Sequence, residues 1–228
     1  LIQRGGKKVR EWSGKVAYQV TDPPEWLDWN MYCGPAPLRE YQGHRFGGTH
    51  RGYWDYEGGG LADMAHHSLD GPAYQYGRDL IAPVEITPHA PPAHPEACGM
   101  WGWCELKYAD GLTIVLDSGE WGEPYDRLKP RNEGEREIRG MLSQEDRKKL
   151  DAMPDPAPLV RFADAIRTRQ QAGGHAEASH RVAMIYHLAN IAFRTGRVLH
   201  FDPVKEEIVG DEEANRLVYQ PMRAPWHI

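Results

Sequence analysis

The sequence predicts an α+β fold, with strands in the middle of the chain and helices in its last third. Short apolar runs at 83–87, 101–108 and 112–118 have the length and flanking turn residues typical of strands. Segments after residue 143 repeat apolar residues at helical spacing instead. Strands and helices do not alternate strictly, as a doubly wound fold would require. With 228 residues and no internal repeat, the chain has the size of one domain.

The first third predicts one strand, a long loop and a helix. Residues 16–20 alternate apolar and polar side chains, which favours a strand. Residues 21–60 are rich in glycine, proline and aromatic residues, so we expect an ordered segment pinned by its rings. A loop this long in a compact domain is usually functional. A helix follows from about Leu61, and Gly71-Pro72 is expected to kink or restart it behind a cap at Asp70.

The middle of the chain predicts a hairpin. Residues 101–108 and 112–118 are joined at Asp110-Gly111, a dipeptide that strongly favours a tight turn. Residues 119–140 are charged and contain glycine, which indicates another loop with some strand.

The last third predicts helices with recognisable ends. Ser143 begins one, with Asp146 in a capping-box-like position. Asp155-Pro156 opens a second helix with an apolar stripe along it, and residues 179–194 form a third that Gly196 ends. A strand is expected at Val198 to Phe201, and Asp211 is expected to cap a short final helix.

Composition and charge exclude several classes of function. The net charge is −6 and no long basic run occurs, which argues against nucleic acid or an anionic membrane as a partner. No apolar run approaches the roughly 20 residues of a membrane span. The cysteines, Cys33, Cys98 and Cys104, are odd in number and lack zinc-ribbon spacing, so neither a disulfide framework nor a metal site is predicted from them.

Motifs for nucleotides and for a serine nucleophile are missing from this sequence. Gly58-Gly59-Gly60 has Asp63 where a dinucleotide fingerprint needs its third glycine. Neither a P-loop nor a Gly-x-Ser-x-Gly occurs. We therefore predict no cofactor-binding residue in this chain.

The helix after the glycines carries the strongest candidate chemistry. Asp63 and Asp70 lie one turn before and after His67, and His66 is adjacent. A carboxylate one turn from an imidazole can fix its tautomer and raise its basicity, which suits a proton relay. The same spacing also fits a metal site or a purely structural polar contact. Spacing alone does not decide between these three interpretations.

Two further groups carry polar side chains of interest. Arg51, Trp54 and Asp55 precede the glycines, and such a cluster suits polyol recognition but serves equally as a loop anchor. His180 and His187 share a helical face, either as polar residues lining a packed helix or as residues facing the same pocket as His67.

Ten segments resemble a known pattern in the right order. They are Trp26-Leu-Asp-Trp29, Gly34-Pro-Ala-Pro37, Arg51 to Gly60, Leu61 to Asp70, His180-Arg181, His187 to Ala192, Gly196-Arg197, Asp202-Pro203, Asp211 to Asn215 and Pro221 to Trp226. Together they resemble the C-terminal domain of the bacterial Gfo/Idh/MocA oxidoreductases. The resemblance covers most of residues 21–78 and 175–228, whereas 95–160 match poorly.

The resemblance implies an open, mostly antiparallel sheet with helices on one face. It implies that residues 1–228 are one C-terminal domain for substrate binding and oligomerisation, with a sugar or cyclitol as ligand and a homo-oligomer formed through the sheet. The family's acid–base pair maps onto Asp63 and His67. Asp70 matches the family's trailing aspartate and His180 a position near the pocket. With these, the substrate-binding residues we expect are Arg51, Trp54, Asp55, His66, Asp70 and His180.

In the family, a Rossmann domain ahead of this one holds NAD or NADP and supplies a catalytic lysine. Neither is in this sequence, so the chain alone is expected to bind no cofactor and to transfer no hydride. The alternatives are an orphan domain acting as a lyase, hydrolase or epimerase on an oxidised sugar, with or without a metal, and a non-catalytic sugar-binding module. The sequence does not choose between NAD and NADP, or between the cytoplasm and export behind a leader.

Overall fold

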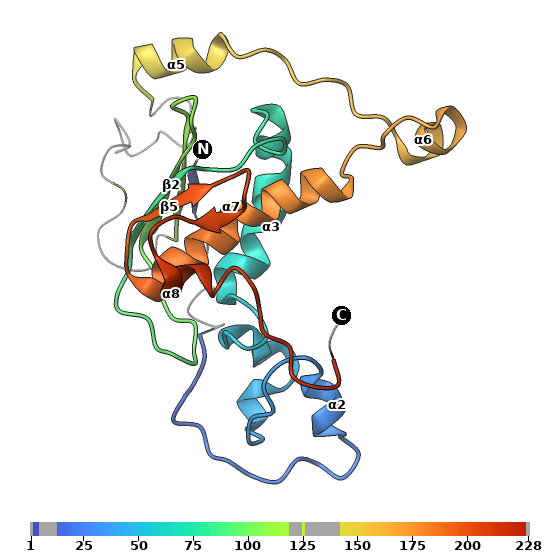
Figure 1. The fold of residues 1–228 in the computed structure, drawn as a ribbon, viewed down its shortest axis with the longest axis vertical. Helices are drawn as coiled ribbons and strands as arrows, with labels where there is room; N and C mark the ends of the chain where they lie inside the picture. The colour runs from blue at the N-terminus through green and yellow to red at the C-terminus, as the bar shows by residue number, and fades with distance from the viewer. Residues whose placement is uncertain (1, 5–12, 119–124, 126–141, 227–228) are drawn as a thin grey trace, which may run out of the picture.

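The computed structural model describes residues 2–4, 13–118, 125 and 142–226 (Figure 1). The fold is α+β, as predicted, and is built on a six-stranded sheet of order β1-β4-β3-β2-β5-β6. Its strands are β1 Ile2–Arg4, β2 Glu85–His89, β3 Trp103–Lys107, β4 Thr113–Asp117, β5 Leu199–Asp202 and β6 Glu207–Ile208. Only β1 pairs in parallel, with β4, so the expectation of an open and mostly antiparallel sheet is confirmed.

The predicted hairpin forms the centre of the sheet. Leu106 of β3 lies opposite Ile114 of β4, and the turn between them contains Gly111 at φ +87°, where a side chain would be strained. Side chains alternate along β3, so Cys104 and Leu106 point into the core while Glu105 and Lys107 point to the opposite face.

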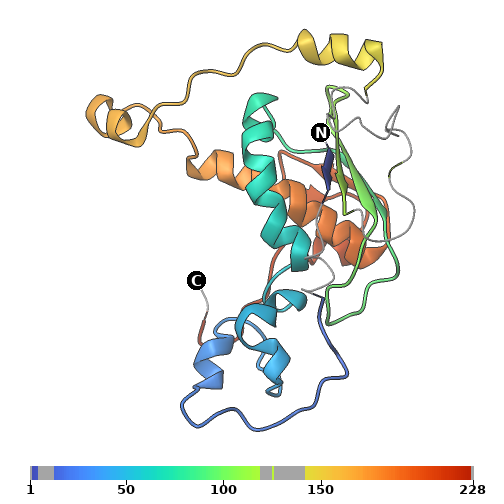
Figure 2. The ribbon, with the colours of Figure 1, turned by 180° about the vertical axis from the view of Figure 1, so that it is seen from behind.

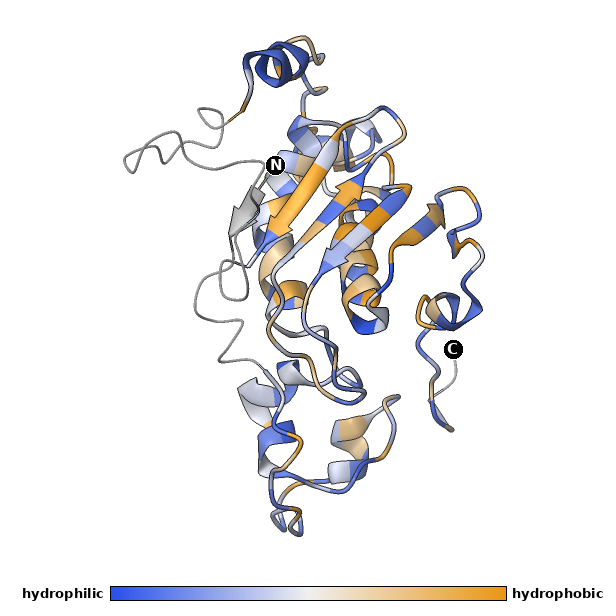
Figure 3. Cartoon of the chain, turned by 90° about the vertical axis from the view of Figure 1, so that its left-hand side faces the viewer, coloured by the Kyte–Doolittle hydropathy of each residue, from blue (hydrophilic) through white to orange (hydrophobic). Residues whose placement is uncertain are grey.

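Two long helices cover one face of the sheet. They are α3 Gly59–Gln75 and α7 Ala176–Thr195, which pack on each other and close the main core (Figures 1 and 2). Leu61 and Leu69 of α3 and Ile185 and Leu188 of α7 are buried there. Figure 3 looks onto the opposite face of the sheet, where these helices lie behind the strands.

Residues 13–57 form a smaller lobe beside the start of α3 (Figure 1). Its helical pieces are α2 Trp29–Cys33, η1 Gly43–Arg45 and η2 Gly47–Gly52. Tyr53 is fully buried, and its ring lies under the guanidinium of Arg45. The C-terminal segment returns to this lobe, where the backbone N–H of Arg223 donates to Pro35. The C-terminal segment is thereby held against the small lobe.

Residues 143–175 stand away from the body as an arm (Figure 2). The arm carries α5 Gln144–Asp151 and α6 Phe162–Thr168, and α8 Glu212–Asn215 lies near the C-terminus. The predicted caps are confirmed at Ser143, which accepts from the N–H of Asp146, and at Asp211, which accepts from Ala214.

Several expectations were wrong. Residues 16–20 form no strand beyond one bridge from Val20 to Gln42, because their apolar side chains are largely exposed and meet no core. Helix α3 runs through Pro72 as one helix, so the alternative of a restart behind a cap at Asp70 was wrong. Helix α6 begins at Phe162 rather than at Pro156, because the prolines at 154, 156 and 158 disfavour helix at and before each of them.

The expectation for residues 119–140 lies outside the described part of the chain. No helix in the described ranges is both long enough and apolar enough to cross a membrane.

Candidate functional site

The glycines before α3 are required by close packing. A Cβ on Gly58 would lie 2.1 Å from Nδ2 of Asn190, which belongs to α7. A Cβ on Gly59 would lie 2.8 Å from Cβ of Cys98, and Gly59 also has φ +68°. The start of α3 is therefore locked against α7 and against the strand-like segment at Cys98.

The same contacts test whether a dinucleotide fits here. A pyrophosphate bound at a helix N-terminus needs open space beside the glycines. At Gly58 and Gly59 that space is filled by Asn190 and Cys98. The close contacts at Gly58 and Gly59 therefore leave no room for a pyrophosphate against these two glycines, and the sequence lacks the third glycine of the fingerprint.

Asp63 is held by an arginine from the small lobe. Nε of Arg51 donates to Oδ1 of Asp63 at 3.0 Å, and Nη1 of Arg51 donates to the carbonyl of Gly48 at 2.9 Å. Glu57 lies 3.9 Å from the same guanidinium. The hydrogen bond to Asp63 raises the pKa of Arg51, and the negative charges of Asp63 and Glu57 add to that effect. The side chains of Arg51 and Asp63 are 30% and 20% exposed, so the pair lies at an accessible surface.

His67 and Asp70 follow Asp63 along α3, as the spacing predicted. Four residues of α-helix correspond to about 6 Å of rise, so Asp63 and His67 start one turn apart. His67 and Asp70 are both exposed. The side chain of His66 lies outside the described part of the structure. The outer face of α3 thus carries an arginine-bound carboxylate and an accessible imidazole in sequence.

The other two predicted residues of the small lobe, Trp54 and Asp55, contact neither Asp63 nor each other in the described hydrogen bonds and ion pairs. Trp54 donates from Nε1 to the carbonyl of His94 at 2.9 Å and lines a cavity beside α7. The carboxylate of Asp55 receives Nε of Arg39 at 2.8 Å and lies 3.6 Å from Nη1 of the buried Arg45. Asp55 therefore anchors the lobe, and Arg51 is the member of the cluster that reaches Asp63.

His180 lies on α7 and pairs with the turn after β5. Its Nε2 lies 3.0 Å from Oε2 of Glu206, and Arg181 lies 3.3 Å from the other oxygen of the same carboxylate. Within the described residues, His180 pairs with Glu206 and Asp63 pairs with Arg51, so the two predicted residues are not brought together by a hydrogen bond or ion pair. No group of three or more His, Cys, Asp or Glu side chains in this part of the chain has the arrangement of a metal site.

A comparison with protein families decides the relationship of the chain. The sequence model of GFO_IDH_MocA_C2, described as the oxidoreductase family C-terminal alpha/beta domain, matches residues 4–228. The chain belongs to the Gfo/Idh/MocA oxidoreductase family. The match confirms the resemblance of the quoted motifs and the fold expected from them, for the C-terminal domain alone. The family as a whole is NAD(P)-dependent. No curated protein matches the chain.

Sequence reasoning missed Asn190, which packs beside the start of α3. Asn190 is buried on α7 and its Nδ2 meets Gly58. An amide within the apolar run from Leu188 to Phe193 was the available signal, because a buried polar group needs a reason. Glu57, whose carboxylate lies 3.9 Å from Nε of Arg51, carried no such signal.

Proposed function

We propose that this chain is the substrate-binding and oligomerisation domain of an NAD(P)-dependent oxidoreductase that acts on a sugar, a sugar derivative or a cyclitol. The nicotinamide would be held by a nucleotide-binding domain outside this chain. The family membership supports the reaction class. The observation that carries the proposal for the site is the bond between Arg51 and Asp63, one turn from the exposed His67.

In this proposal the pair moves a proton. An imidazole can act as a general base and a general acid, so His67 can accept the proton of a substrate hydroxyl or return it to a carbonyl. Asp63 orients the imidazole or a substrate hydroxyl, and Arg51 fixes the carboxylate in one position. Because Arg51 also binds the backbone of the small lobe, that lobe and α3 are held together at the reacting surface.

Turnover with matched variants tests this proposal. The chain is joined to a nucleotide-binding domain of the family, and reduced nicotinamide is measured with a panel of aldoses and cyclitols. We expect Asp63→Asn and His67→Gln each to lower kcat/KM by about 10²- to 10⁴-fold, the usual contribution of general acid–base catalysis. Ser68→Ala, an exposed neighbour on α3, is the control and should keep full turnover. Unchanged turnover in both acid–base variants would refute the proposed roles.

The open face of the sheet is the proposed oligomer interface. Trp103 stacks on His89 with ring centroids 4.8 Å apart and meets Tyr125 edge-on at 5.1 Å. Aromatic side chains on a half-buried sheet face favour association. Light scattering should show a mass above that of the monomer. Thr87→Glu, placed opposite Glu105, should lower that mass, whereas Ser68→Glu on α3 should not. A monomeric wild-type chain would refute the interface.

A further inference from the structure

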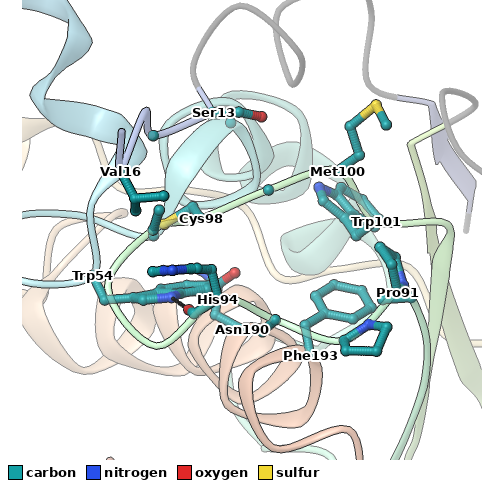
Figure 4. A pocket seen from close by; sticks show the side chains of 18 residues that line it. Ser13, Val16, Trp54, Pro91, His94, Cys98, Met100, Trp101, Asn190 and Phe193 are labelled. Carbon is teal, nitrogen blue, oxygen red and sulfur yellow. Dashed lines mark hydrogen bonds between the residues drawn. The ribbon is translucent and has the colours of Figure 1, made fainter. Parts of the chain in front are cut away.

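A cavity of about 210 Å³ lies where α3 begins (Figure 4). Its walls come from the turn at Gly58 to Gly60, from α7 and from the loop between β2 and β3. Trp54, Trp101 and Phe193 supply aromatic surface, and Figure 4 shows these rings around a common space. The cavity therefore has flat apolar walls of the kind that enclose a ring-shaped or planar ligand.

Two buried side chains of this wall have hydrogen-bond donors without partners among the described residues. Trp101 is 7% exposed and Asn190 is 8% exposed. In the part of the chain that the structure describes, neither Nε1 of Trp101 nor Nδ2 of Asn190 has an acceptor. Buried polar atoms in folded proteins nearly always have a partner, so an exception calls for an explanation. Two such donors in the wall of one cavity indicate a missing acceptor.

The rest of the wall also favours an acceptor over a donor. The described lining contains no aspartate or glutamate. Helix α3 starts at the cavity without a side-chain cap, so the N–H groups of its first turn carry unneutralised positive character. The guanidinium of Arg194 lies 5.5 Å from the ring of Trp54. The described wall therefore offers N–H groups and contains no carboxylate of its own.

We propose that this cavity binds a small carboxylate with a flat or cyclic apolar body. A carboxylate offers only acceptors, which matches the donors of Trp101 and Asn190, whereas a polyol also needs acceptors for its own hydroxyl protons. The apolar body lies between the aromatic rings. The described lining includes neither Asp63 nor His67, so the site is separate from the proposed acid–base pair. Gly60 in the wall precedes Asp63 by one turn, about 4.5 Å of helix rise.

Both donor nitrogens are closed off from solvent in the unliganded structure. An incoming carboxylate therefore reaches them by displacing part of the wall. The segment that can move is the loop at 90–100, where Pro92, His94 and Gly99 are exposed. Within this loop Gly99 and Met100, next to Trp101, can shift, whereas Cys98 is buried and its backbone is bonded to Gly14 and Gly52. The donors behind the loop are already stripped of water.

Benzoate is the probe that tests this site, with benzyl alcohol as an uncharged compound that carries the same ring. Both are titrated into the 228-residue chain while the indole N–H signals are followed by NMR. We expect benzoate to shift the N–H of Trp101 and to leave Trp26, which is 73% exposed, unchanged. Benzyl alcohol should bind about tenfold more weakly, the usual effect of losing a charge-assisted hydrogen bond.

Variants of the wall separate binding in the cavity from binding elsewhere. Trp101→Phe keeps a ring but removes the donor, and Asn190→Ala removes the second donor. Each should weaken benzoate about tenfold and leave benzyl alcohol unchanged. If a variant does not fold, the wild-type chain still tests the proposal. Its affinities for benzoate and benzyl alcohol are compared, and so are the shifts of the Trp101 and Trp26 indole signals. Equal affinity for both ligands, no shift at Trp101, or equal shifts at Trp26 would overturn the proposal. The measurement uses no nucleotide and no turnover, so it does not depend on the proposed oxidoreductase function.

Discussion

Replacing Gly58 by alanine should destabilise the fold through overlap with two neighbours, Asn190 and Ala62. The new Cβ would lie 2.1 Å from Nδ2 of Asn190 and 2.9 Å from Cβ of Ala62, both closer than real Cβ atoms approach their neighbours. The backbone of Gly58, at φ −110° and ψ 29°, is open to alanine, so the cost comes from overlap alone. Because Asn190 is buried, its amide has little freedom to move away.

The size of this effect follows from known overpacking costs. Overfilling a well-packed site costs about 1–3 kcal/mol. Alanine at a helix N-cap is slightly worse than glycine, but it also lowers the entropy of the unfolded chain, and these two effects roughly cancel. We therefore expect Gly58→Ala to lower the free energy of unfolding by about 2 kcal/mol. For a chain of this size that corresponds to a Tm lower by about 4–8 °C.

A double-mutant cycle read by thermal and urea unfolding checks the reasoning. Asn190→Ala removes the clashing amide, so Gly58→Ala should cost less than half as much in that background. The residual cost comes from Ala62, which stays at 2.9 Å. Additive losses for Gly58→Ala and Asn190→Ala would show that the two residues do not meet. A neutral Gly58→Ala would show that the amide moves aside, and would refute the locked packing of α3 on α7.

Three further outcomes follow from particular contacts. Gly71→Ala in α3, where a Cβ meets nothing within 4 Å, should raise unfolding stability by about 0.5–1 kcal/mol in denaturant titrations, because alanine is the better helix former. Burial lowers the pKa of His44, so the folded state holds this side chain neutral. Its contribution to the free energy of unfolding is complete above about pH 6.5 and is lost as the pH falls below that value, because the unfolded chain then takes up the proton first. His44→Asn, which keeps a donor near the hydroxyl of Tyr53, should flatten this part of a stability-versus-pH curve. The hydrogen bonds from Arg78 lower the pKa of Asp110. Because the pair is partly solvated, Asp110→Asn should lower the free energy of unfolding by about 1 kcal/mol or less at neutral pH. The difference in stability from wild type should shrink as the pH falls below about 4. An unchanged difference at acid pH would contradict the assignment.

Local signals in the sequence predicted the ends of elements well. Ser143, Asp211 and Gly196 act as caps because capping depends on residues within one turn. Strand β1 was missed, because its parallel pairing of Ile2 with Val115 joins distant parts of the chain and leaves no local pattern. Residues 16–20 show the converse, since their alternation is genuine but no sheet lies beneath them.

In the candidate site, too, the local features were predicted from the sequence and the long-range contacts were not. Helical spacing placed Asp63, His67 and Asp70 on one face of α3, and the helix confirms that placement. The partner of Asp63 comes from Arg51, twelve residues earlier on a separate turn, and the partner of Gly58 comes from the distant Asn190. Such contacts depend on how lobes and helices pack, which periodicity does not encode.

The start of α3 joins the three features on which the proposals rest. Gly58 and Gly59 fix its position against Asn190 and Cys98, and that position aims Asp63 at Arg51 and forms one wall of the cavity. A small shift of the backbone at Gly58 should therefore disturb both the cavity and the acid–base face. We expect Gly58→Ala to weaken benzoate binding and to lower turnover of the fused enzyme together.

Gly71→Ala, at the other end of the same helix, is the matched control and should alter neither benzoate binding nor turnover. If Gly58→Ala changed turnover and left benzoate binding intact, the cavity and the acid–base face would be positioned independently. The shared role of the α3 start would then be wrong, whereas each site taken separately would still stand on its own test.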